Sequence, residues 1–137
     1  MTAPLLLDTC ALIWCTTFAE APKLRALLLE AHESAQPIWI SPITAWEIGN
    51  LATAGRIGMS RPVLAWFTEA VATAGAKLAE LGVRVLAEST NLPGEIHRDP
   101  ADRILIATAR EYGLRIVTRD RKILDYADKG NVMALAC

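Results

Sequence analysis

The sequence lacks the features of several specialised protein classes. Its three cysteines, Cys10, Cys15 and Cys137, show no CxxC spacing and have no histidine close by, so neither a disulfide framework nor a zinc site is indicated. Charge of one sign is also missing, because 14 Lys and Arg residues face 15 Asp and Glu residues. This balance excludes a global basic field that would draw the chain to nucleic acid or anionic membranes, so any such partner must be bound locally.

Long hydrophobic runs and a secretion signal are absent as well. The longest apolar stretches, such as residues 3–7 and 104–107, are far shorter than the roughly 20 residues of a membrane span. The amino terminus has no basic region ahead of an apolar segment, so we expect a cytoplasmic protein with no membrane association. With 53% hydrophobic and 21% charged residues, the 137-residue chain is expected to form one compact domain, residues 1–137.

Short apolar runs alternate with helical patterns along the chain. Strands are predicted at about 4–8, 37–40, 114–118 and, as an edge strand, 132–135. Helices are predicted at 11–14, 21–35, 42–54, 61–75 and 100–112, with loops at 92–98 and 119–121. Residues 76–91 are ambiguous: we favour a strand at 76–81 followed by a helix, and the alternative is a strand at 83–86. This alternation predicts an α/β domain whose mainly parallel sheet of four or five short strands is covered on both faces.

Five acidic residues fall where predicted strands end or where the following helices begin. They are Asp8, Glu47, Asp99, Asp102 and Asp120. Right-handed crossovers bring these positions to one edge of a parallel sheet, where such folds bind ligands, so we expect the five acids to converge. Each acid also has a purely structural interpretation, since Asp99 is a good helix N-cap and Asp120 suits a turn.

Carboxylates gathered without Lys or Arg neighbours would repel one another by several kcal/mol, and a divalent cation removes this conflict. Glu47 in particular lies among apolar neighbours and needs a partner. An oxygen ligand set with no His or Cys suits Mg²⁺, or Mn²⁺, rather than Zn²⁺. Such an ion lowers the pKa of bound water and offsets phosphate charge, so the pattern is typical of phosphodiester hydrolysis.

Four segments, in this order along the chain, resemble the acidic blocks of PIN-domain ribonucleases, and within them of the VapC toxins of type II toxin–antitoxin systems. They are residues 7–14 (LDTCALIW), 41–48 (SPITAWEI), 97–109 (HRDPADRILIATA) and 117–120 (VTRD). The resemblance spans nearly the whole chain, and four blocks are far more specific than one. It implies a single PIN domain with a three-layer α/β/α fold.

The resemblance further implies a Mg²⁺-dependent endoribonuclease, a hydrolase that cleaves RNA with a metal-activated water. By position, Asp8, Glu47, Asp102 and Asp120 would be the catalytic, metal-holding acids, with support from Thr9, Thr118 and Asp99. Many family members have Asn at the position of Asp120 and a further acid at that of Ile123. The implied partners are an RNA substrate and a cognate VapB-like antitoxin whose tail covers the groove. The implied assembly is a homodimer that forms a heterotetramer or larger complex with the antitoxin.

Several other side chains are candidates for binding. Four arginines flank the acidic blocks and could hold RNA phosphates: Arg98, Arg103, Arg119 and Arg121. Exposure to solvent is the plain alternative for each, and Arg103 could instead pair with a neighbouring acid. His97 could contact substrate, although a lone loop histidine is more often at the surface. Most tryptophans are expected in the core, while Trp14, Trp66 and Phe67 could line an antitoxin groove or dimer contact.

Three other functions remain open to these residues. A receiver-like domain also collects acids for Mg²⁺, but Asp8 follows leucines, and Lys122 and Lys129 come after helical or loop positions, which disfavours it. An acidic groove could bind a basic partner tail without turnover. A metal-dependent nuclease could also act on DNA, which lacks the 2′-hydroxyl of RNA.

Overall fold

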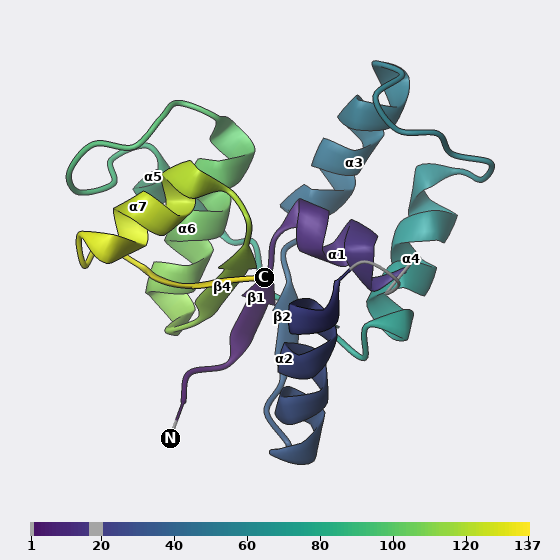
Figure 1. Cartoon of the computed structure of the whole chain (residues 1–137). Helices are drawn as coiled ribbons and strands as arrows, with labels where there is room; N and C mark the ends of the chain where they lie inside the picture. The colour runs from purple at the N-terminus through teal and green to yellow at the C-terminus, as the bar shows by residue number, and fades with distance from the viewer. Residues whose placement is uncertain (1, 17–20) are drawn as a thin grey trace.

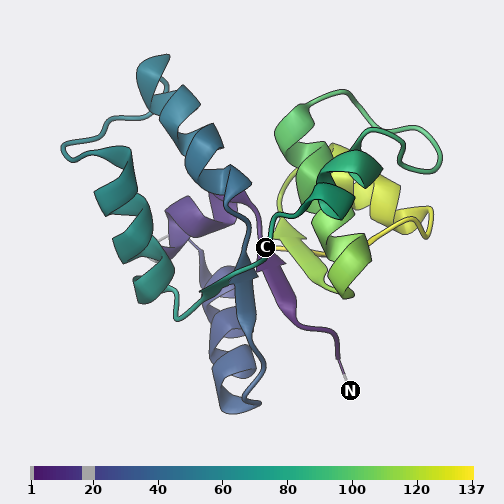
Figure 2. The same cartoon turned by 180° about the vertical axis from the view of Figure 1, so that it is seen from behind.

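The computed structural model describes residues 2–16 and 21–137, which form a parallel sheet between two layers of helices (Figures 1 and 2). Its strands are β1 (Leu5–Leu7), β2 (Ile38–Ile40), β3 (Lys77–Leu78), β4 (Arg115–Thr118) and β5 (Met133–Ala136). They lie in the order β3-β2-β1-β4-β5, and every neighbouring pair is parallel. The predicted α/β fold is confirmed, with five strands and with β5 at one edge of the sheet.

The helices join the strands in pairs or singly. They are α1 (Thr9–Cys15), α2 (Pro22–Glu33), α3 (Ile43–Thr53), α4 (Val63–Thr73), α5 (Val83–Ser89), α6 (Pro100–Tyr112) and α7 (Arg121–Asp128). The ambiguous segment forms β3 and then α5, as the favoured interpretation predicted. Helix α7 was not predicted, and its first residue, Arg121, lies in the expected loop. Only Ile123 and Tyr126 of α7 are buried, which leaves too short an apolar pattern to read from the sequence.

Alternating side chains of the central strands divide the core into two clusters. Leu5 and Leu7 of β1 pack with buried residues of α1 to α4, whereas Leu6 between them packs with buried residues of α5 to α7. Val117 and Ile116 of β4 divide in the same way. The sheet is therefore the middle of three layers, and both of its faces are apolar.

The direction of winding reverses between β1 and β4. From β1 the chain proceeds outward to β2 and β3 through α1 to α4, and it then returns through α5 and α6 to β4 on the other side of β1. In open α/β sheets, ligands bind beyond the carboxyl ends of strands at such a switch point. Asp8 directly follows β1, and Asp120 stands two residues after β4, so both lie at this point.

Proline, serine and glycine residues lie at several helix ends. Pro22 and Pro100 are the first residues of their helices. The Ser41 hydroxyl accepts a hydrogen bond from the Ile43 N–H at 3.1 Å, at the start of α3. Helix α6 ends at Gly113, whose φ of 67° is the left-handed value that glycine adopts at low cost. None of the helices within residues 2–16 and 21–137 combines the length and apolarity needed to cross a membrane.

Candidate active site

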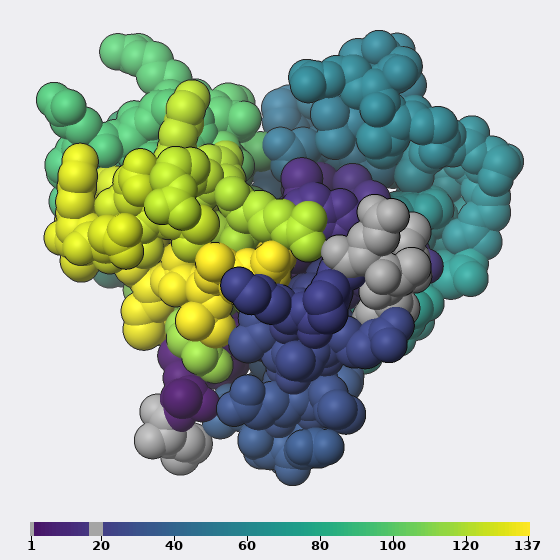
Figure 3. Space-filling model, in the orientation of Figure 1, coloured from purple at the N-terminus to yellow at the C-terminus, as the bar shows by residue number. Residues whose placement is uncertain are grey.

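A pocket of about 450 Å³ at the carboxyl edge of the sheet collects all five predicted acids. Its lining consists of Asp8, Thr9, Cys10, Trp14, Glu47, Leu51, Arg56, Asp99, Asp102, Arg119 and Asp120. The molecular surface is hollowed between α3 and the segment near residue 100 (Figure 3). The acids come from the ends of β1 and β4 and the first turns of α3 and α6, as their positions in the sequence predicted.

Asp8 is the most deeply buried of the five acids. The residue is 7% exposed, and its side chain caps α1 by accepting a hydrogen bond from the Ala11 N–H at 2.8 Å. The pKa of Asp8 is raised to about 6, mainly by burial and to a lesser extent by the carboxylates of Asp102 and Glu47, while the Thr118 hydroxyl and the Ala11 N–H act in the opposite direction. The ionised form of Asp8 is therefore destabilised in the folded protein.

Thr118 joins the two acids at the switch point. Its fully buried hydroxyl donates a hydrogen bond to Asp8 and accepts one from the backbone N–H of Asp120 at 2.9 Å. Asp120 in turn caps α7 by accepting from the Lys122 N–H at 2.8 Å. One hydroxyl thus fixes the spacing between the ends of β1 and β4.

The Glu47 side chain extends from α3 into the pocket and forms a hydrogen bond with Thr9 of α1. The Thr9 hydroxyl, at the start of α1, donates a hydrogen bond to Glu47 Oε1 and lies 3.4 Å from the Thr44 hydroxyl. Burial raises the pKa of Glu47, and the carboxylates of Asp99 and Asp120 act in the same direction. Thr9 therefore supplies the partner that the apolar surroundings of Glu47 require.

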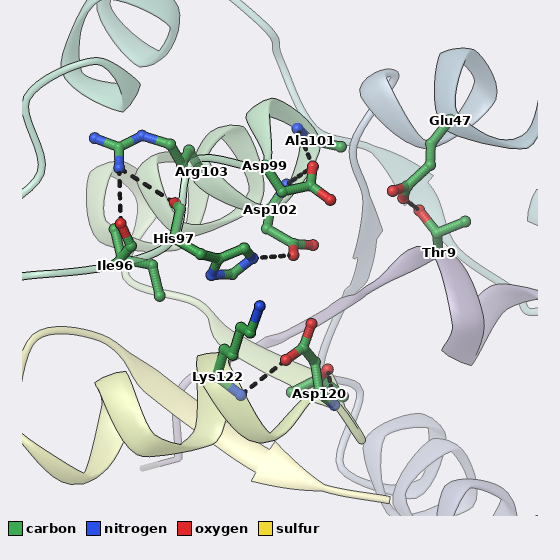
Figure 4. A network of polar contacts seen from close by, with 11 residues as sticks. Thr9, Glu47, Ile96, His97, Asp99, Ala101, Asp102, Arg103, Asp120 and Lys122 are labelled. Atoms are coloured by element: carbon green, nitrogen blue, oxygen red, sulfur yellow. Dashed lines mark hydrogen bonds and ion pairs between the residues drawn. The ribbon is translucent and has the colours of Figure 1, made fainter. Parts of the chain in front are cut away.

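Asp99 and Asp102 enter from the first turn of α6. Asp99 is the helix N-cap, because its Oδ1 accepts from the N–H groups of Ala101 at 3.0 Å and Asp102 at 3.4 Å. Asp102 lies 2.6 Å from the Nε2 atom of His97 (Figure 4). Burial raises the pKa of Asp102 to about 6, Asp99 and Asp120 add to the rise, and the His97 contact opposes it.

His97 is closer to the acids than its place in a loop suggested. Its side chain is only 18% exposed, and its Nδ1 atom is buried with no hydrogen-bond partner among the described residues. The sequence predicted a group of acids with no histidine, whereas the structure places the His97 ring against one of them, Asp102. The HxxxxD spacing was the only signal in the sequence, and it does not by itself indicate a contact.

The donor atoms are close enough to share a cation. One oxygen from each of Glu47, Asp99 and Asp102 lies within 4.8 Å of the others, and atoms of His97, Asp102 and Asp120 form a second group of this kind. Because His97 Nε2 already contacts Asp102, the carboxylates are the available donors, and oxygen ligands suit Mg²⁺ or Mn²⁺. Burial is the main cause of the raised pKa values of Asp8 and Asp102, and repulsion from the other carboxylates adds to it. A divalent cation would offset that repulsion.

The expectation that no cation neighbours the acids is wrong. Arg56 and Arg119 line the pocket, and the Arg119 guanidinium lies 3.8 Å from the centroid of the Trp14 ring. The Lys122 side chain points from α7 toward the acids (Figure 4). Lys122 therefore lies at the same edge of the sheet as the acids, contrary to the argument from its position in the sequence. Recognising α7 would have revealed this placement.

The four predicted RNA-binding arginines have different surroundings. Arg98 is exposed and forms no hydrogen bond or ion pair with the part of the chain that the structure describes. Arg119 lies in the acidic pocket, and Arg121 forms an exposed ion pair with Asp125 at 3.5 Å. The alternative that Arg103 pairs with an acid is wrong, because it donates to the backbone carbonyls of three residues. These are Ser89, Ile96 and His97, at 2.9, 3.3 and 3.4 Å.

The aromatic residues are mostly in the core, as expected. Phe67 is buried, and Trp14, Trp39 and Trp66 are partly buried against the two clusters. Trp46 is the exception, with 52% of its surface exposed on α3. The buried residues of α3 are Thr44 and Ile48, and Trp46 lies on another face of the helix.

Comparisons with known proteins agree with the observed fold. The model of the PIN domain family matches residues 5–129. The protein named Ribonuclease VapC22, from Mycobacterium tuberculosis (strain ATCC 25618 / H37Rv), is 36% identical over 121 residues. This match covers 86% of the present chain and 88% of that relative.

Three solved structures share the fold. VapBC2 from Rickettsia felis, bound to a DNA fragment from its promoter, gives a TM-score of 0.68 at 11% identity, covering 96% of this chain and 97% of that one. A toxin–antitoxin complex from Klebsiella pneumoniae gives 0.61 at 23% identity, with coverages of 96% and 95%. FitAcB from Neisseria gonorrhoeae gives 0.60 at 19% identity, with 96% of both chains covered.

Proposed function

Since the chain belongs to the PIN-domain family and is a homologue of a VapC ribonuclease, we propose that it is the toxin of a VapBC-type pair, a metal-dependent endoribonuclease. The observation that carries this proposal is the convergence of five carboxylates at the switch point of the sheet. Acids that are costly to bury together are best explained by a bound divalent cation.

The carboxylates of Asp8, Glu47, Asp102 and Asp120, which all line the pocket, would hold Mg²⁺ or Mn²⁺, with Asp99 beside them. Glu47, Asp102 and Asp120 belong to the two groups of close donor atoms, and Asp8 contributes from the wall of the same pocket. Bound there, the ion would lower the pKa of a water molecule and offset negative charge on the phosphate. This proposal accounts for the pKa values of about 6 at Asp8 and Asp102, since a site built for a cation is strained without one.

The remaining polar side chains would orient the acids and the substrate. The hydroxyls of Thr9 and Thr118 fix Glu47 and Asp8, and the His97 ring fixes Asp102. Glu47 is half-buried with a raised pKa, which suits it to accept a proton from an attacking water. Arg119 lies on the wall of the pocket, where its guanidinium can contact RNA phosphates.

The proposal includes an antitoxin partner. Two of the similar structures are described as a toxin–antitoxin complex and as VapBC2, which supports such a partner here. The exposed apolar side chains of Trp46 on α3 and Leu64 on α4 are available for contact with it. We also propose a homodimer, joined by antitoxin into a heterotetramer or larger complex. Light scattering of the protein alone and with antitoxin measures both states.

A comparison of RNA and DNA of the same sequence tests the proposed activity. Antitoxin-free protein is incubated with each single strand in Mg²⁺, in Mn²⁺ and in EDTA, beside Glu47→Gln and, as a matched control, Glu33→Gln at the exposed end of α2. We expect cleavage of RNA alone, lost in EDTA and in Glu47→Gln and kept in Glu33→Gln. Equal cleavage of DNA would indicate a DNA-directed nuclease. Intact strands with bound metal would indicate an acidic binding groove without turnover.

A further inference from the structure

A second hollow, of about 910 Å³, opens beside the acidic pocket. Residues 94–98 form it together with Thr90 and Arg103. None of these residues lines the acidic pocket, yet the two sites are adjacent, because His97 belongs to the hollow while its ring contacts Asp102 in the pocket (Figure 4). A strand whose phosphate lies over the acids can therefore extend its next nucleotide into this hollow.

Side chains of two helices hold the loop that forms the hollow through hydrogen bonds to its backbone. Arg103 of α6 donates hydrogen bonds to the carbonyls of Ser89, Ile96 and His97 (Figure 4 shows the last two). The Tyr126 hydroxyl of α7 donates to the carbonyl of Pro93. Because these bonds hold the backbone between α5 and α6 before any ligand arrives, little ordering is needed on binding, as in most ligand sites.

The hollow is lined by one basic and one acidic side chain that are exposed to solvent. Arg98 and Glu95 are both exposed, and neither forms a hydrogen bond or ion pair within the described residues. A subsite for phosphate alone would be lined by cations, and the Glu95 carboxylate would repel it. The edge of a nucleic-acid base offers both acceptors for a guanidinium and N–H donors for a carboxylate. The pair therefore matches a base better than a phosphate.

We propose that this hollow binds one unpaired base next to the cleaved bond and so selects the RNA sequence that is cut. The inference rests on the proposed ribonuclease function and adds its specificity subsite. RNA is read mostly through unstacked bases whose edges are free, which is the state that a hollow of this size can accept. Arg98 would donate to the base acceptors, and Glu95 would accept from its N–H groups.

The test is the base preference around the cut in a library of RNA with randomised positions. Wild-type protein is compared with Glu95→Gln and with Glu88→Gln, a matched control at an exposed site on α5 outside the hollow. Glu95→Gln keeps the size of the side chain and removes its charge. We expect it to change the preference at one position beside the cut by about tenfold, the effect of one good base contact, while Glu88→Gln changes none.

Replacing the second charge provides an independent check. Arg98→Ala should relax the preference at the same position, and Arg98→Lys should not restore it, because a lysine lacks the planar fork of donors. An unchanged preference in Glu95→Gln and Arg98→Ala, or a wild-type profile with no base preference, would overturn the inference while the ribonuclease function stands. A library left intact by the wild-type protein would overturn both.

Discussion

Asp8 shows how one side chain can serve the fold and the proposed chemistry at once. It caps α1 through the Ala11 N–H, accepts a bond from Thr118 and is almost removed from water. The first two contacts stabilise its charged form, while burial destabilises it and is the largest effect, so the pKa is raised to about 6. A carboxylate that served only as a helix cap could form the same hydrogen bond at the surface, without being removed from water.

The substitution Asp8→Asn separates the cap from the charge. Asparagine is an equally good N-cap, so we expect metal-free Asp8→Asn to gain about 1–2 kcal/mol in unfolding free energy at pH 7.5, because the buried charge is gone. Urea denaturation measures this, with Asp128→Asn at the exposed end of α7 as the control, expected within about 0.5 kcal/mol of wild type. At pH 4 the gain should vanish, since Asp8 is then protonated. A loss of stability at pH 7.5 would contradict the account.

The raised pKa values also predict how metal binding depends on pH. A carboxyl with a folded pKa above its unfolded value binds more protons in the folded state, so metal-free stability rises as the pH falls through about 6 toward 4. Protons on Asp8 and Asp102 would compete with a cation bound at the proposed site. We therefore expect the increase in Tm caused by Mg²⁺ to be large at pH 7.5 and to fade below about pH 6. An increase that persists at pH 4.5 would rule out these acids as the ligands.

The buried hydroxyl of Thr118 can be removed without changing the shape of the side chain. Thr118→Val takes the donor from Asp8 and the acceptor from the Asp120 N–H, so we expect affinity for Mn²⁺ to fall about tenfold. Isothermal titration measures the affinity. Thr108→Val is the matched control, because the buried Thr108 hydroxyl donates only within α6, to the Ile104 carbonyl. Equal affinities in the two variants would show that Thr118 does not orient the acids.

At the scale of the elements, α6 presents two acids from one helix start. Asp99 caps the helix, while Asp102, one turn later, contacts His97. Asp99→Ala should cost about 1 kcal/mol of stability because the cap is lost, whereas Asp99→Asn should keep the cap and stability. Both should weaken Mn²⁺ binding, since each removes a charge close to Glu47 and Asp102. Thermal unfolding and titration separate the two effects, and equal stability of the two variants would disprove the capping role.

The elements that the sequence predicted are those with strong local signals. Pro22 and Pro100 mark helix starts, and Gly113 marks a helix end. A continuous apolar run marks β1, and consecutive β-branched residues at 116–118 mark β4. Helix α7 gave no such signal. It is short and mostly polar, and only two of its residues are buried. Packing against the rest of the fold, rather than local helix propensity, therefore stabilises it.

The acidic residues of the site were predictable for the same reason. Each stands at a strand end or helix start, and the winding of a parallel sheet brings those positions together without knowledge of any loop. The contacts with the acids that were not predicted come from less regular parts of the fold. Arg56 follows α3, His97 lies in the loop before α6, and Lys122 belongs to the unpredicted helix. Whether these side chains lie near the acids depends on the conformation of these segments at the carboxyl edge of the sheet.

At the scale of the whole molecule, the chain brings together acids from four separate segments of the sequence. The ends of β1 and β4 supply Asp8 and Asp120, and α3 and α6 approach from opposite sides with Glu47 and Asp102. The core clusters on both sheet faces hold these elements in place around the site. Such preorganisation suits a reaction whose chemistry is largely positioning and charge stabilisation.

The chemical identity of the RNA ends is the measurement that tests the central claim most directly. Antitoxin-free protein cleaves a labelled RNA in Mg²⁺, with EDTA and Asp8→Asn as controls, and the new ends are analysed by mass spectrometry. If water held at the acidic site attacks the phosphate, no fragment carries a 2′,3′-cyclic phosphate, and both controls leave the RNA intact. Cyclic phosphate ends, or cleavage that survives EDTA or Asp8→Asn, would contradict a metal-dependent hydrolysis at these carboxylates.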